Sequence, residues 1–436
     1  MNRRDFLALL AAASSGFALN RALPLRAAED FALPQPASSG IDHIVLVMME
    51  NRSFDHLMGW LPGANGRQAR LVYRDPAGVT HATHQESPDY TGCPITAPFR
   101  DPDHSYEGGR IQYDSGKMDG FLLDPNNDIY SIGYYVENDL PFYSALARHF
   151  TTLDHYFCSI LGPTFPNRIF QHAAQTDRLS NTTTISSLPT IWDKLNAAGV
   201  PAKYYYSNVP FLALWGTKYL NVSASYAQFL VDAAAGTLPA FSFIDPRYTV
   251  TDDGTGNDDH PHADIRAGDS FLAQTYKAVA TSPNWSKTVF IVNFDEWGGF
   301  FDHVAPPRAA APNGIDPDLV NGKALLGFRV PTVVASPFTV GNPSRPVVNQ
   351  LTFDHTSVLK LLEWRWGLTP LTARDASSDV NNLLNVLRLR NPQTSVPSLP
   401  QPLPPVPQPC PLGAAQTAQD ILDLQSLAVA EGWPVF

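Results

Sequence analysis

The sequence predicts an α/β fold, a three-layer sandwich whose central sheet is mostly parallel. Two continuous apolar runs, residues 44–49 (IVLVMM) and 288–294 (TVFIVNF), are typical of strands buried on both faces. Other apolar segments alternate with segments of helical spacing, an order that indicates a parallel sheet covered by helices. With 436 residues, of which 44% are hydrophobic, the chain can bury a sizeable core.

The elements follow from apolar periodicity and from turn residues. Residues 60–140 hold few periodic segments and many Gly, Pro, Asp and Tyr, so we expect long loop insertions that carry site residues. Beyond them we expect a helix at 141–150, a short strand from 151, a Gly-Pro turn and a helix beginning near Asn167. Later elements are a helix at 191–198, strands at 202–206 and 240–244, a polar loop at 251–262, a helix at 263–281, a strand at 330–335 and a helix at 355–366.

Both ends of the chain differ from this pattern. Residues 1–28 have a twin-arginine start (Arg3-Arg4), an apolar stretch and small residues near Ala28, which predicts export by the twin-arginine route to the periplasm or the medium. A Sec signal with a chance arginine pair is the alternative. We expect one large domain at 29–390. Residues 391–436 form a proline-rich extension, either extended along the surface or disordered, with a terminal helix at 414–430.

Charge and cysteine content exclude several classes of function. The net charge of −11 argues against a nucleic acid or an anionic membrane surface as a partner. The three cysteines, Cys93, Cys158 and Cys410, allow one disulfide and one thiol in an oxidising compartment, and the pairing stays open. No C-x-x-C or Cys/His cluster is present, so a thiolate zinc site is not expected.

Polar residues stand at three places where a strand or turn ends. Glu50-Asn51 follows the first apolar run, Thr164 lies within GPTFPNR, and Asp295-Glu296 follows the second run. Ligands in open α/β sheets bind beyond the carboxyl ends of strands, and such oxygen ligands suit a hard cation. Thr164 lies just before a predicted helix, whose amino terminus favours an anion. A metal, a hydroxyl and a helix start together indicate a phosphoryl-transfer site.

Five motifs resemble those of the bacterial phosphoesterase family, which includes phospholipases C and an acid phosphatase within the alkaline-phosphatase-like superfamily. They occur in order over about residues 40–370: ENRSFDH, GPTFPNR, HPHADI, DEWGGFFDHV and FDHTSVLKLLEWRWG. The resemblance implies an alkaline-phosphatase-like catalytic domain. It also implies that Thr164 is the nucleophile and touches the metal, and that the other metal ligands are Glu50, Asn51, Asp295 and Glu296.

The resemblance assigns further roles to histidines and to one asparagine. His104, in DPDHSYEGG, matches a histidine that faces the phosphoryl group, and His260 matches that of the H-P-x-A-D motif. His262 occupies the variable position of that motif and could be confused with His260. Asn167 would hold a phosphate oxygen or order the turn, and His303 would line the site or order the Asp295 loop.

The predicted function is that of a metal-dependent phosphoesterase, a phospholipase C that cleaves phosphatidylcholine-type diesters to diacylglycerol and a phosphorylated head group. Thr164 would attack phosphorus, and a protonated histidine would donate its proton to the leaving alcohol. Water would then hydrolyse the threonyl phosphate. The alternatives are an acid phosphatase acting on monoesters and, because of Gly268-Asp269-Ser270, a GDS-type serine esterase. The ligands do not distinguish Ca, Mg, Mn or Fe. Expected partners are a phospholipid or small phosphate ester, with transient contact to a lipid surface; neither nucleic acid nor a stable protein partner is expected.

Overall fold

The computed structural model describes residues 35–93, 99–410 and 418–436. The predicted export signal at residues 1–28 lies outside this part of the chain. The chain divides into two units, residues 1–39 and 40–436. In the first unit, the described part contains a short 3-10 helix at Pro36–Ser38. The second unit contains the predicted sheet and all the predicted site residues.

The central sheet has eight strands within the described residues, in the order β14-β6-β13-β10-β1-β9-β7-β8. Neighbouring strands pair in parallel, except that β13 is antiparallel to both β10 and β6. The strands are β1 (His43–Met49), β6 (Thr151–Leu153), β7 (Ala202–Tyr206), β8 (Ser223–Ser225), β9 (Phe241–Ile244), β10 (Thr288–Phe294), β13 (Val333–Ala335) and β14 (Val347–Asn349).

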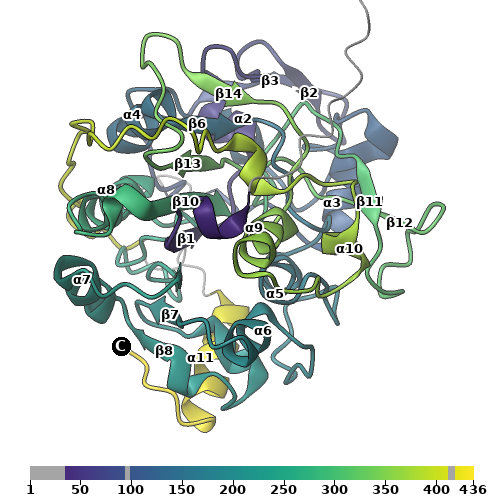
Figure 1. Ribbon diagram of the computed structural model, residues 1–436. Coiled ribbons are helices and arrows are strands. Elements are labelled where there is room, and N and C mark those ends of the chain that lie inside the picture. Colours follow the sequence, from purple (N-terminus) through teal and green to yellow (C-terminus); the bar gives the residue numbers. More distant parts are fainter. Residues whose placement is uncertain (1–34, 94–98, 411–417) are drawn as a thin grey trace, which may run out of the picture. The chain divides into compact units, whose positions relative to one another are not determined.

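Helices cover the two faces of the sheet, which confirms the predicted three-layer α/β sandwich (Figure 1). One layer contains α4 (Pro141–His149), α7 (Tyr226–Ala235) and α8 (Ile265–Ala280). The other contains α5 (Thr164–Ala173), α6 (Ile191–Ala197), α9 (Thr356–Trp366) and α10 (Ala373–Ala376). The larger contacts among these helices lie within each layer, such as α4 with α8 and α5 with α9, as expected when a sheet separates the two groups.

Shorter elements are added to this sandwich, and most of them lie in the predicted loop insertions. Three two-stranded ribbons pair β2 with β3, β4 with β5, and β11 with β12. Their strands are β2 (Val72–Arg74), β3 (Thr80–Ala82), β4 (His84–Gln85), β5 (Gly133–Tyr134), β11 (Arg308–Ala310) and β12 (Lys323–Leu325). The remaining α-helices in the described residues are α2 (Phe54–Met58), α3 (Tyr106–Tyr113) and α11 (Gln419–Ala430).

Prolines explain two differences from the predicted boundaries. The helix expected near Asn167 begins at Thr164 instead, because Pro166 lies in its first turn, where a missing N–H costs no helical hydrogen bond. The strand expected from residue 330 begins at Val333, two residues after Pro331, which has no N–H to give to a sheet. The predicted helix at 414–430 appears as α11, and residues 411–417 lie outside the described part.

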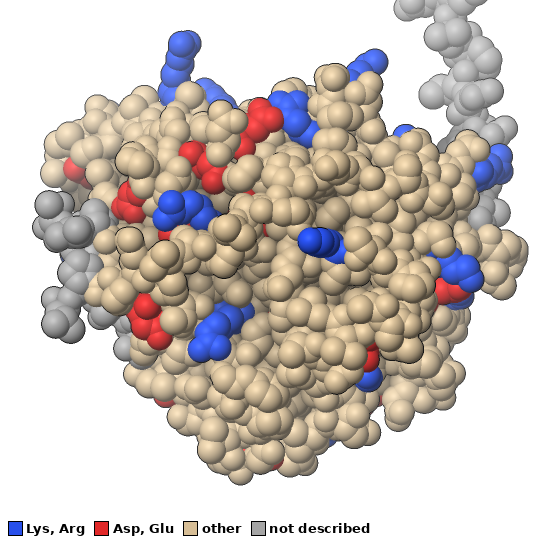
Figure 2. All heavy atoms as spheres, turned by 90° about the vertical axis from the view of Figure 1, so that its left-hand side faces the viewer, with Lys and Arg blue, Asp and Glu red and all other residues tan. Residues whose placement is uncertain are grey.

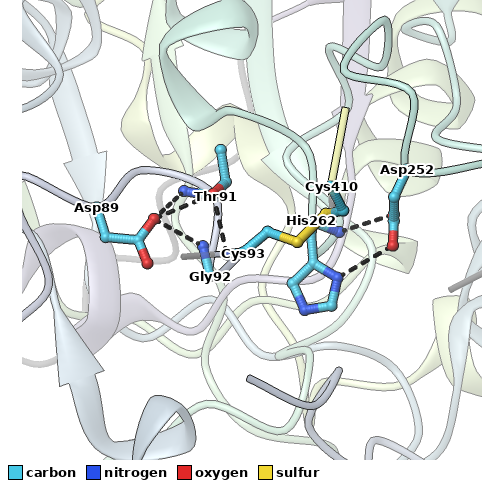
Figure 3. Close-up of a disulfide and its surroundings, with 7 residues drawn as sticks. All are labelled: Asp89, Thr91, Gly92, Cys93, Asp252, His262 and Cys410. Carbon is cyan, nitrogen blue, oxygen red and sulfur yellow. Dashed lines mark hydrogen bonds and ion pairs between the residues drawn. A yellow bond between two sulfur atoms is a disulfide. The ribbon is translucent and has the colours of Figure 1, made fainter. Parts of the chain in front are cut away.

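A disulfide joins Cys93 to Cys410 and so answers the pairing question that the sequence left open (Figure 3). It connects a loop near the start of the chain to the end of the proline-rich segment. That segment, residues 391–410, contains neither helix nor strand. Cys158 is a buried free thiol. None of the helices in the described residues is long and apolar enough to cross a membrane.

The cysteine arrangement predicts a thiol count. Unreduced protein unfolded in guanidinium should react with Ellman's reagent at one thiol, and reduced protein at three. Folded protein should not react, because Cys158 is buried and burial raises the pKa of its thiol. Three reactive thiols in unreduced, unfolded protein would show that the disulfide does not form.

Candidate active site

Two neighbouring strands deliver the predicted carboxylates to one place. β1 and β10 pair in parallel with Met49 opposite Phe294, so Glu50-Asn51 and Asp295-Glu296 leave the sheet side by side. The Asp295 N–H donates to the Met49 carbonyl at 3.1 Å, and the Asn51 N–H donates to Asp295 Oδ1 at 3.1 Å. These bonds continue the strand pairing by one residue and fix the positions of the side chains beyond it.

A glycine permits the close approach of the two strand ends. Asn51 has a positive φ of 51°, and its carbonyl faces Gly298, which has a φ of 63°. A Cβ at Gly298 would lie 2.2 Å from the Asn51 oxygen, closer than any real Cβ contact. The first glycine of DEWGG is therefore required for both its backbone conformation and its lack of a side chain.

Thr164 is the first residue of α5 and is almost fully buried. Its hydroxyl donates to Asn51 Oδ1 at 3.4 Å, which places the predicted nucleophile beside the end of β1. In the first turn of this helix, Pro166 has no N–H, and the Phe165 N–H donates to Asn181 Oδ1 at 2.7 Å. The Thr164 N–H has no partner among the described residues, so it is the donor that favours an anion there.

Asn167 orders the turn that leads into α5. Its Oδ1 accepts from the Ile160 N–H at 3.1 Å, and its Nδ2 donates to the carbonyls of Gly162 at 2.7 Å and Ile160 at 3.1 Å. The side chain is fully buried by these contacts. Of the two roles that the sequence suggested for Asn167, these bonds correspond to ordering the turn; contact with a substrate stays a prediction.

Arg168 connects the carboxylates at the strand ends, a role that the sequence analysis missed. Its guanidinium lies 2.7 Å from Glu50 Oε1, 2.7 Å from Asp245 Oδ1 and 3.1 Å from Asp295 Oδ2, and all four side chains are buried. Arg168 follows Thr164 by four residues, so both project from the same face of α5. The four-residue spacing of Thr164 and Arg168 was the available signal for Arg168. For Asp245 the signal was its position directly after the strand predicted at 240–244.

The buried carboxylates fit a bound cation. Arg168 supplies one positive charge against Glu50, Asp245 and Asp295, and Glu296 is buried as well. Burial and the neighbouring Asp295 carboxylate raise the pKa of Glu50 well above its ordinary value. Glu296 Oε1 is buried without a hydrogen-bond partner in the described residues. Excess buried negative charge and an unpaired oxygen are what an oxygen-liganded metal would satisfy, together with Asn51 and Thr164.

His104 lies against this group. Its Nε2 is 3.4 Å from Asn51 Nδ2 and 3.9 Å from Glu296 Oε1, and its Nδ1 is 2.8 Å from the Pro102 carbonyl. Burial lowers the pKa of His104, but the carboxylates of Glu296 and Asp101 outweigh it and raise the pKa to about 9. An imidazolium beside the predicted nucleophile can give up a proton.

His260, and not His262, is placed next to His104. The two rings lie 5.8 Å apart, and His260 Nε2 is 3.7 Å from Asp101 Oδ2. Asp101, His104 and His260 each offer a ligand atom within 4.8 Å of the others, so this group could also hold a metal ion. His262 lies beside the Cys93–Cys410 disulfide, and its Nδ1 is 3.2 Å from Asp252 Oδ2 (Figure 3).

His303 occupies a separate buried cluster. Its Nδ1 contacts Asp55, its Nε2 lies 3.1 Å from Asn65 Oδ1, and Arg329 pairs with both Asp55 and Asp302. The described contacts of His303 therefore do not include the strand-end carboxylates, Thr164 or His104. This placement fits a residue that orders the loop after Asp295; a role of His303 in lining the site and binding substrate stays a prediction.

A pocket of about 380 Å³ adjoins the nucleophile. It is lined by Asp101, His104, Pro163 and Asn181, among others. Asn181 donates to Asp420 Oδ2 of α11, so the C-terminal helix also contributes to this side of the site. By contrast, Ser270 of the Gly268-Asp269-Ser270 triplet lies within α8 and donates to the Pro402 carbonyl at 3.0 Å.

Comparisons with known proteins identify the family. Residues 41–369 match the model of the phosphoesterase family. Non-specific phospholipase C1 of Arabidopsis thaliana is 32% identical over 377 residues, which cover 79% of this chain and 70% of that protein. Phospholipase C B of Mycobacterium tuberculosis is 33% identical over 491 residues, which cover 94% and 90%. The chain therefore belongs to the phosphoesterase family and is a phosphoric ester hydrolase.

Proposed function

We propose that the chain is a metal-dependent phospholipase C that hydrolyses phosphatidylcholine-type diesters, with Thr164 as the nucleophile. The observation that carries this proposal is the position of the Thr164 hydroxyl, 3.4 Å from Asn51 Oδ1 at the start of α5. Relatives that carry the name phospholipase C, at 30–33% identity over most of the chain, support the substrate class.

Thr164, His104 and His260 have separate roles in the proposed reaction. Thr164 Oγ1 gives its proton to water and forms a bond to phosphorus, while the phosphorus–oxygen bond to diacylglycerol breaks. The His104 imidazolium gives a proton to the departing alkoxide. Water then attacks phosphorus and gives a proton to the neutral imidazole. The bond between phosphorus and Thr164 Oγ1 breaks, and Oγ1 takes a proton back from water. His260, paired with Asp101 beside His104, completes the acid–base group on this side.

Glu50, Asn51, Thr164, Asp295 and Glu296 are the residues that would hold the metal ion. The chemistry that such an ion supplies when bound is neutralisation of phosphoryl charge and a lower pKa for an adjacent hydroxyl. Asn51, held in its positive-φ conformation against Gly298, orients its amide oxygen toward Thr164. The Thr164 N–H in the first turn of α5, which is free within the described part of the chain, adds a donor where negative charge develops.

We further propose that the protein acts in the periplasm or outside the cell after twin-arginine export. The Cys93–Cys410 disulfide supports an oxidising compartment, where such bonds persist.

Replacement of Thr164 tests the nucleophile. Thr164→Ala should lower kcat by about 10⁴-fold or more, because no other group takes over the covalent step. Thr164→Ser should keep substantial activity, since it retains a hydroxyl at the helix start. Mass spectrometry of acid-quenched wild-type enzyme should find a phosphorylated head group on the peptide containing Thr164. An Ala variant with more than a few per cent of wild-type turnover would exclude Thr164 as the nucleophile.

Replacement of Glu50 tests the metal site. Glu50→Gln should lose bound metal, measured by inductively coupled plasma mass spectrometry, together with activity. Asp245→Asn is the matched control, because Asp245 pairs with Arg168 at the same 2.7 Å but lies outside the proposed ligand set. The control should keep its metal. Equal metal content in Glu50→Gln and wild type would remove Glu50 from the ligands.

Two chromogenic substrates separate the proposed diesterase from an acid phosphatase. Turnover of p-nitrophenylphosphorylcholine should exceed that of p-nitrophenyl phosphate. The reason is that a diesterase attacks a phosphorus atom that is still esterified to the choline head group. A strong preference for the monoester across pH would assign the chain as a phosphatase instead. Hydrolysis that resists both chelation and Thr164→Ala would indicate a serine esterase.

A further inference from the structure

The proline-rich segment at residues 391–410, called here the strap, is chemically unlike the rest of the chain. Eight of its twenty residues are proline and none is charged, whereas 16% of the whole chain is charged. Figure 1 draws it as a yellow-green trace beside α8. Figure 2 faces that side of the molecule and shows wide areas without Lys, Arg, Asp or Glu.

Hydrogen bonds and a disulfide fix the strap to the rest of the second unit at the strap's beginning, middle and end. The Gln393 N–H donates to the Pro337 carbonyl at 2.7 Å, and Ser270 of α8 donates to the Pro402 carbonyl at 3.0 Å. The Cys410 N–H donates to the Asp252 carbonyl at 2.9 Å, and Cys410 forms the disulfide with Cys93. A proline-rich segment held in this way presents its outward side chains on a stiff backbone.

Two of those outward side chains are large and apolar. Leu403 is 87% exposed and Val406 is 79% exposed, the highest values among the large hydrophobic side chains of the described residues. Leu399, four residues before Leu403, is 8% exposed. The strap therefore buries Leu399 and exposes Leu403 and Val406 to water. Transfer of these two exposed side chains to an apolar environment would be favourable.

A groove of about 760 Å³ lies between the strap and α8. Phe271, Tyr226 and strap residues such as Leu403 give it apolar walls, and Arg247 and Lys277 also line it. Within the described residues, neither of these two cations forms an ion pair. Apolar walls with two unpaired cations match a phospholipid, which joins acyl chains to a phosphate.

We propose that the strap and its groove form the surface by which this protein docks on a zwitterionic phospholipid bilayer. Leu403 and Val406 enter the boundary between head groups and acyl chains, and Arg247 and Lys277 meet a lipid phosphate. The uncharged strap suits a zwitterionic surface, whereas the net charge of −11 opposes an anionic one. This inference rests on the proposed function, for which it identifies the membrane-facing surface.

The docking surface lies close to the candidate active site. Asn257 lines the groove and precedes His260 by three residues, so their Cα atoms are no more than about 11 Å apart. Arg247 follows Asp245, which pairs with Arg168 of the site, by two residues. Docking through the strap therefore brings lipid to within a short distance of the group that would cleave it.

Vesicle sedimentation tests the surface. Full-length protein carrying Thr164→Ala, so that lipid is not consumed, is spun with vesicles of pure phosphatidylcholine. Leu403→Asp/Val406→Asp should weaken partitioning at least about tenfold, because both side chains lose their apolar burial. Val72→Asp/Val79→Asp is the matched control, with side chains 60% and 54% exposed elsewhere; it should bind like the parent. Arg247→Gln/Lys277→Gln should weaken binding by about tenfold, and Arg345→Gln should not.

Turnover of soluble p-nitrophenylphosphorylcholine, measured with Thr164 intact, separates docking from catalysis. Leu403→Asp/Val406→Asp should leave it unchanged while hydrolysis of vesicle lipid falls. A parent protein that does not sediment with vesicles, or a strap variant that binds as tightly as the Val72/Val79 control, would overturn the docking proposal. So would a strap-dependent dimer in sedimentation velocity. Absence of soluble turnover in the wild type would instead refute the proposed function and leave the binding result to stand by itself.

Discussion

The neutralisation of buried carboxylates around Arg168 is the constraint on which the rest of the site depends. Parallel pairing of β1 and β10 brings Glu50 and Asp295 to the same end of the sheet, and Asp245 follows β9 beside them. Buried carboxylates need a close cation or a proton. Because Arg168 provides that cation from α5, the same ion pairs fix the start of α5, and with it Thr164, against the strand ends.

The histidines are positioned by loops that the sheet does not order by itself. His104 comes from the long insertion after β1, and His260 from the loop before α8. The Cys93–Cys410 disulfide ties the first insertion to the strap, and Cys410 and His262 both bond to Asp252 in the second loop. One covalent bond and its neighbours thus connect both histidine loops to the strap, whose exposed apolar residues face outward beside the site.

Local sequence patterns were enough to predict much of the fold and many of the site residues. The apolar runs at β1 and β10, the helical spacing of α8 and the motif residues at strand ends are all properties of short stretches, so they could be read directly. Helix and strand starts at Thr164 and Val333 were misplaced, because prolines tolerated in a first helical turn or excluded from a sheet shift the boundary by a few residues. Arg168 was named only as part of a motif, since its three partners lie far apart in the sequence.

The sequence by itself determined the α/β class, the family motifs and the identity of the groups at the strand ends, because side-chain chemistry and short periodicities are local. Tertiary structure alone decided which of them meet. It placed His260 by His104 and His262 by the disulfide, although only Pro261 lies between them in the sequence. It also placed His303 with Asp55 and Arg329, and paired Cys93 with Cys410 across 317 residues. Such contacts depend on how loops return to the sheet, and no local pattern encodes that path.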